Sequence, residues 1–144
     1  AYLRQIGADT VDVRKMFSGN LEGYIKRYQL ISDARHICPG VSLVVSRSTT
    51  PRAVAAQAAD ELINISDVAT SFVVFPEPGG AICISGRSYG KVNVQFVLEK
   101  IGGGGSLTSA GAQFPDKSTD ETAVILTQAI EDYLKEIENK EKPE

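Results

Sequence analysis

The residues best suited to chemistry lie in two short segments in the second half of the chain. Residues 102–106 read Gly-Gly-Gly-Gly-Ser, and Arg87 lies within Ser85-Gly86-Arg87-Ser88. Glycines adopt positive φ angles and allow backbone N–H groups to come close to a ligand, as turns that bind phosphate do. Arginine presents a planar set of donors that matches phosphate oxygens. The two segments together predict a local anion site.

Each segment also has a purely structural interpretation. Arg87 could be a surface arginine at a strand end, and the residues alone weigh this equally with ligand binding. The glycine run could be a mobile turn or an engineered spacer, but Ile101 before it and the strand-like segment 107–114 after it favour a turn that belongs to the fold. A glycine-rich loop by itself is weak evidence for a phosphate site.

The rest of the sequence offers few side chains that are typical of catalysis or metal binding. His36 is the only histidine, and no Cys or His pair has the spacing of zinc ligands, so the sequence predicts no metal site and no catalytic residue in this chain. We interpret His36 as a partly exposed residue near a helix end, where a positive charge suits the helix dipole. Asp33, Asp60 and Asp67 are scattered, and we place Asp60 at a solvated helix end.

Composition sets the broad class of the protein. A chain of 144 residues with 42% hydrophobic residues has the size of one domain with a core. Its 15 basic and 18 acidic side chains give a formal net charge of -3, which argues against broad attraction to nucleic acid. Cys38 and Cys83 lie far apart without a signal-like segment, which favours buried thiols in a reducing cytosol. No apolar run reaches the roughly 20 residues of a membrane span, so we expect a soluble chain.

The elements that must position the two segments alternate between helical and extended patterns. The first helix is predicted from a cap at Asn20 to about Arg35, and the second follows Thr50-Pro51 as cap and first turn. A third, of about ten residues, leads into the glycine run, and Ser118 with Glu121 forms a capping box for the last. We expect that last helix to fray from Glu136 onward. The predicted strands are 41–45, 71–75, 81–85 and 107–114.

Residues 76–80 hold two prolines and two glycines, so the second and third of these strands should form an antiparallel pair. The predicted class is therefore α+β, with a small mixed β-sheet of about four strands and helices packed on it.

Several segments resemble the DHHA1 domain of the DHH phosphoesterase superfamily, and most closely the membrane-bound cyclic-di-AMP phosphodiesterases of the GdpP type. The resemblance spans nearly the whole chain, and its first part is similar to the stretch that joins the DHH and DHHA1 domains of that family. The chain begins at Ala1 without an initiator Met, so we expect a fragment. The similar segments are 1–4, 7–11, 21–25, 57–60, 85–95, 99–105, 107–108 and 110–113.

The resemblance implies a division of labour between two domains. A preceding DHH domain would hold manganese and activate water, while this chain would bind substrate and not be active alone. It implies that residues 1–18 are a linker remnant, residues 19–138 the DHHA1 domain and residues 139–144 a charged tail. The implied substrate contacts are Arg87 and residues 102–105, supported by Ser85, Ser88 and Ser106.

One position departs from the family pattern. The family loop reads Gly-Gly-Gly-His, and Ser106 stands where the histidine belongs. A serine hydroxyl can bind phosphate but lacks the reach and the charge of an imidazole.

The implied function is hydrolysis of cyclic-di-AMP or a related cyclic dinucleotide by the parent. The alternatives are a phosphodiesterase for short oligonucleotides (nanoRNA) and a non-catalytic, nucleotide-responsive binding module. The implied partners are the nucleotide, the DHH domain and a second copy in a homodimer of the parent. The implied location is a cytoplasmic domain of a membrane-anchored bacterial protein, with no membrane contact by this fragment.

Overall fold

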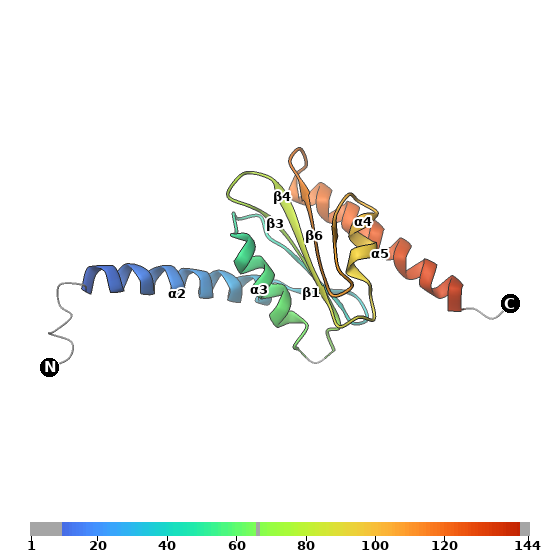
Figure 1. Ribbon diagram of the computed structural model, residues 1–144, viewed down its shortest axis with the longest axis horizontal. Helices are drawn as coiled ribbons and strands as arrows, with labels where there is room; N and C mark the ends of the chain where they lie inside the picture. The colour runs from blue at the N-terminus through green and yellow to red at the C-terminus, as the bar shows by residue number, and fades with distance from the viewer. Residues whose placement is uncertain (1–9, 66, 142–144) are drawn as a thin grey trace.

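A six-stranded mixed sheet forms the centre of the domain (Figure 1). The computed structural model describes residues 10–65 and 67–141, and their side chains from Leu21 onward. Strand order is β1-β2-β3-β4-β6-β5; β2 and β3 run parallel and all other neighbours are antiparallel. The strands are β1 (Arg35–Cys38), β2 (Val41–Val45), β3 (Thr70–Pro76), β4 (Ile82–Ser88), β5 (Gly104–Gly105) and β6 (Ser109–Phe114).

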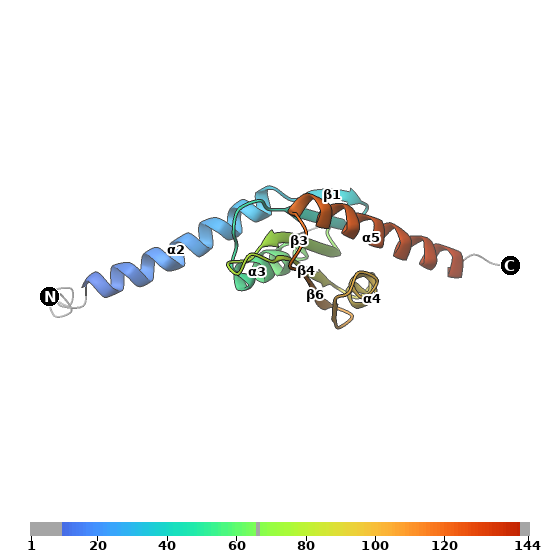
Figure 2. The ribbon, with the colours of Figure 1, turned by 90° about the horizontal axis from the view of Figure 1, so that it is seen from above.

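Helices cover both faces of this sheet, because apolar side chains alternate along its central strands. Phe72 and Val74 of β3 belong to a core with α4 and α5, whereas Val73 and Phe75 belong to a second core with α2 and α3. The two longest helices extend away from the sheet in opposite directions (Figures 1 and 2). The helices are α2 (Thr10–Ser32), α3 (Arg52–Leu62), α4 (Val94–Glu99) and α5 (Thr119–Glu141).

The α+β class and the mixed sheet are confirmed, but the sheet has two strands more than the predicted four. One is β1, where the first helix was expected to continue to Arg35; α2 ends at Ser32 instead, and β1 pairs with β2. His36 is exposed, as expected, but it lies in this edge strand, four residues after α2 ends at Ser32. The other is β5, which lies inside the glycine run.

Several predicted element boundaries shift. Asn20 lies inside α2 and does not cap it, since that helix already includes Thr10. The N-cap of α3 is Pro51, while the Thr50 hydroxyl donates to the carbonyl of Ser48 at 2.9 Å. Helix α4 has six residues instead of about ten. Helix α5 continues to Glu141, beyond the expected fraying point.

Other local predictions are confirmed. Strand β2 spans the predicted residues 41–45, and β3 and β4 form the expected antiparallel hairpin. The capping box is present: the N–H of Glu121 donates to the Ser118 hydroxyl at 3.1 Å, and the Ser118 N–H donates to the Glu121 carboxylate at 3.4 Å. In the ranges that the structure describes, no helix is both long enough and apolar enough to cross a membrane.

Candidate functional site

A trough of about 620 Å³ lies beside α3 on one face of the sheet. Its floor includes β4 and β6, one wall is α3, and residues 102–105 line the opposite side. Strands β4 and β6 pair with Ser85 opposite Gly111 and Arg87 opposite Ser109, so these four residues share the face that looks into the trough. The trough thus brings together the two segments that the sequence singled out.

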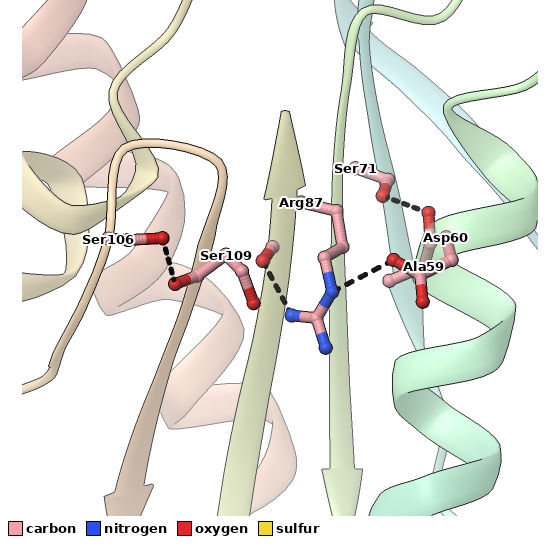
Figure 3. Close-up of polar contacts among 7 residues, drawn as sticks. Ala59, Asp60, Ser71, Arg87, Ser106 and Ser109 are labelled. Carbon is pink, nitrogen blue, oxygen red and sulfur yellow. Dashed lines mark hydrogen bonds and ion pairs between the residues drawn. The ribbon is translucent and has the colours of Figure 1, made fainter. Parts of the chain in front are cut away.

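Arg87 is held in a fixed orientation in this trough (Figure 3). Its Nε lies 2.9 Å from a carboxylate oxygen of Asp60, and its Nη1 donates to the carbonyl of Gly86 at 2.8 Å. In the described part of the chain, Nη2 makes no hydrogen bond. The side chain is 18% exposed, so one donor group of a largely buried guanidinium remains available to a ligand.

Asp60 is the residue of this site that sequence reasoning missed. It was assigned to a solvated helix end, and its side chain is indeed 58% exposed. Its partner lies 27 residues further along the chain, and the contact depends on the placement of α3 over the sheet. The Ser71 hydroxyl fixes that placement by donating to the carbonyl of Ala59 at 2.7 Å (Figure 3). A local sequence pattern carries no signal for such a pair.

The first two glycines of the run end helix α4. Gly102 has a φ of 93°, its N–H donates to Glu99 at 3.3 Å, and the Gly103 N–H donates to Leu98 at 2.7 Å. These two bonds form the Schellman arrangement that satisfies the last carbonyls of a helix. The N–H groups of Gly102 and Gly103 therefore serve the helix, which corrects the expectation that the whole run offers its donors to a ligand.

The other function of the run is close packing against β6. A Cβ atom on Gly103 would lie 2.5 Å from the carbonyl oxygen of Gly111, and one on Gly105 would lie 2.4 Å from that of Ser109. A Cβ atom on Gly104 would meet nothing within 4 Å. Contact with the neighbouring strand β6 thus requires glycine at positions 103 and 105. No side chain rises from either position into the trough.

The three predicted serines have different environments. Ser85 lines the trough, two residues before Arg87 on the same strand. Ser88 does not: strand alternation turns it to the other face, where it is 3% exposed and lies 3.3 Å from the Thr70 hydroxyl. Ser106 is exposed outside the trough lining, and both its N–H and its hydroxyl donate to the carbonyl of Ser109, at 2.7 and 3.2 Å (Figure 3).

A second charged group lies at the other end of the trough. Arg52 binds Glu77 at 2.5 Å, and the Gln113 amide donates to the same carboxylate at 3.3 Å. Burial raises the pKa of the nearby Cys83 thiol above its ordinary value, and the negative charge of Glu77 acts in the same direction. Both arginines of the trough are therefore paired with a carboxylate, and the site has little net charge.

Within 10–65 and 67–141, no three His, Cys, Asp or Glu side chains gather in a way that could hold a metal ion. The side chains available in the trough, Arg87 and Ser85 among them, offer hydrogen-bond donors that an anionic ligand can accept from.

The fold agrees with what comparison with known proteins shows. A family model described as the DHHA1 domain matches residues 40–140, and the chain belongs to this family. The solved structure of an exopolyphosphatase-related protein from Bacteroides fragilis has the same fold, with a TM-score of 0.66 at 20% sequence identity. That match covers 77% of this chain and 34% of the other.

The relatives by sequence are more specific. The chain is 40% identical over 136 residues to the cyclic-di-AMP phosphodiesterase GdpP of Geobacillus thermodenitrificans, which covers 93% of this chain. It is 34% identical over 137 residues to the cyclic-di-AMP phosphodiesterase PdeA of Listeria monocytogenes, which covers 94% of it. In both cases the match covers 21% of the relative, so the chain corresponds to one domain of these larger proteins.

Proposed function

We propose that this domain binds the substrate of a phosphodiesterase that hydrolyses cyclic-di-AMP or a related cyclic dinucleotide, and that a DHH domain of the parent carries out the hydrolysis. The observation that carries the proposal is that Arg87 lines the trough together with residues 102–105, while its Nη2 group has no protein partner among the described residues. The names of the sequence relatives support the choice of substrate.

Arg87 is the main phosphate contact in this proposal. Asp60 holds Nε and the carbonyl of Gly86 holds Nη1, so Nη2 can donate to a phosphate oxygen without reorganisation of the side chain. Ser85 adds a hydroxyl on the same face of β4. The glycines at 102–105 allow the ligand to lie close to the backbone. Ser106 can join the contact only if its hydroxyl leaves Ser109.

The metal belongs to the DHH domain in this proposal. A bound metal ion such as manganese would lower the pKa of a water molecule and neutralise phosphate charge. Residues 1–18 would form the connection to that domain, residues 19–138 the substrate-binding domain and residues 139–144 its charged tail. Helix α2 continues through the first of these boundaries, so the connection and the domain share one helix.

The parent is proposed to be a membrane-anchored bacterial protein that forms a homodimer, with this domain on the cytoplasmic side and away from the membrane. The chain covers only 21% of the length of its GdpP and PdeA relatives, which leaves room for further segments in the parent. A phytoplasma relative at 30% identity is named a membrane protein–ribosomal protein fusion.

The role of Arg87 is tested in the parent protein with manganese and cyclic-di-AMP. We expect Arg87→Ala to lower kcat/KM roughly 10- to 100-fold, because a hydrogen bond to a charged group contributes about 1.5–3 kcal/mol. Arg47→Ala is the matched control: Arg47 also pairs with an aspartate, Asp120, but its side chain is 72% exposed and lies outside the trough. Unchanged kinetics of the Arg87 variant, or an equal loss in both variants, would contradict the assignment.

A non-catalytic, nucleotide-responsive module is the second candidate, and Ser106 favours it because serine cannot supply the charge of the histidine found in the resembled family. An assay of the unmodified parent protein distinguishes the binding module from the phosphodiesterase. Binding of cyclic-di-AMP with no turnover in manganese would favour the module, and turnover favours the phosphodiesterase. A substrate panel that adds short linear oligonucleotides tests the remaining alternative, in which these are the preferred substrates.

A further inference from the structure

We infer that Tyr89 forms a stacking surface for a nucleobase of the substrate, next to the phosphate site at Arg87. The inference rests on the proposed function and adds a contact that the phosphate site does not provide. Tyr89 follows β4 directly and is 62% exposed. Most of the ring surface is therefore open to a ligand that binds at Arg87.

The position of the ring follows from the alternation of the strand. Ser88 is buried against Thr70 on the face covered by α4 and α5, so its neighbours Arg87 and Tyr89 emerge on the face of α3. Two residues on one face of a strand are about 7 Å apart. A nucleotide can span this distance between its phosphate and its base, so one ligand can contact both side chains.

The ring is also held in place. Its hydroxyl donates to the side-chain oxygen of Asn64 at 2.5 Å. Asn64 lies just after the end of α3, four residues after Asp60 in the chain. Asp60 binds Arg87, so two successive contacts between this end of α3 and β4 fix the guanidinium and the ring side by side. Side chains fixed before binding lose less conformational entropy when a ligand arrives.

The surroundings of the ring suit a base more than a second phosphate. Leu107, in the turn before β6, is 44% exposed, and it lies close to Gly90, where a Cβ atom would be 3.9 Å from its Cδ2. Tyr89 and Leu107 thus lie just beyond the trough lining, each two residues along the chain from a lining residue, Arg87 for the tyrosine and Ser109 for the leucine. Aromatic side chains bind nucleobases by stacking, and the energy depends little on which base is bound.

The test compares two ligands that share a phosphate and differ by a base. The parent protein, without manganese, is titrated with 5′-AMP and with ribose 5-phosphate by calorimetry. We expect Tyr89→Ala to weaken 5′-AMP roughly 5- to 150-fold, the range for loss of one base–aromatic stack, and to leave ribose 5-phosphate unchanged. Tyr89→Trp should retain the affinity for 5′-AMP, because the stacking surface is kept.

Tyr28→Ala is the matched control, since Tyr28 is 64% exposed but lies on α2 and not beside Arg87 at the end of β4. It should change neither affinity. If Tyr89→Ala leaves 5′-AMP unchanged, or weakens both ligands equally, the stacking role is wrong. Arg87→Ala separates this failure from that of the proposed function: it should weaken both ligands, and if it weakens neither, the phosphate site itself is wrong.

Discussion

The four glycines at 102–105 look equivalent in the sequence but differ in what each one requires. Gly102 needs its positive φ to end α4, and Gly103 and Gly105 need the absence of a Cβ atom against β6. Gly104 has neither constraint: its φ is not positive, and open space surrounds the place of a Cβ atom. Single alanine substitutions at these four positions should therefore change the free energy of unfolding by different amounts.

We expect Gly103→Ala to lower the free energy of unfolding by about 1–3 kcal/mol, because its Cβ atom would overlap the carbonyl of Gly111 and force the backbone apart. Gly104→Ala is the control and should change the stability by less than about 1 kcal/mol. Urea unfolding followed by circular dichroism measures both variants. Similar losses at the two positions would show that the run is held by something other than contact with β6.

Those parts of the candidate site were predictable in which the residue type alone indicates what the residue can bind. Arg87 and the glycine run could be identified from residue type alone, because arginine is a phosphate-binding side chain and a run of glycines exposes its backbone. The structure places both in the lining of one trough. Ser88 was misplaced because the predicted strand ended too early, which hid its alternation with Arg87. Asp60 could not be found, since its pairing depends on how α3 crosses the sheet.

At the scale of elements, α5 depends on its first turn as well as on its packing. Leu126 and Ile130 are fully or almost fully buried against the sheet, and the hydroxyl oxygen of Tyr133 accepts a hydrogen bond from the N–H of Asn93 at 2.9 Å. The helix therefore supports the start of α4 and, through it, the glycine run. The capping box at Ser118 sets where this helix begins.

We expect Ser118→Ala to lower the free energy of unfolding by about 1 kcal/mol, because the N–H of Glu121 loses its acceptor. Gln128→Ala, an exposed change in the middle of the same helix, is the control and should cost less than about 0.5 kcal/mol, because it removes only a surface hydrogen bond to Asp132. Thermal unfolding monitored by circular dichroism compares the two. A larger loss for the control would mean that the cap contributes little.

Element prediction succeeded where signals are local and failed where they are not. The capping box at Ser118 and the proline-glycine turn between β3 and β4 act within a few residues, and both are confirmed. Strand β5 consists of two glycines with poor strand propensity, and only pairing with β6 makes it a strand. Asn20 has a cap residue's side chain, but the helix continues through it.

At the scale of the whole molecule, α3 covers only part of its face of the sheet and leaves the trough over β4 and β6 open. Both arginines of the trough are paired with carboxylates, so the domain alone presents weak electrostatic attraction to a dianionic ligand. The proposed function requires that a second domain complete the cleft.

We therefore expect residues 1–144 alone to bind cyclic-di-AMP at least about tenfold more weakly than the parent, a difference of about 1.4 kcal/mol. They should show no hydrolysis in manganese. Calorimetry and separation of the reaction products measure the two properties, and Arg87→Ala in the same chain should remove the residual binding. Hydrolysis by the isolated chain would contradict the division of labour between the domains.

The two edges of the sheet have a consequence for behaviour at high concentration. A free edge strand exposes unpaired backbone groups on which another chain can add a strand, and long flat edges promote aggregation. Here one edge is β1, four residues long with an irregular register between His36 and Cys38, and the other is β5, only two residues long. The same short glycine strand that borders the trough thus also gives neighbouring molecules little to pair with.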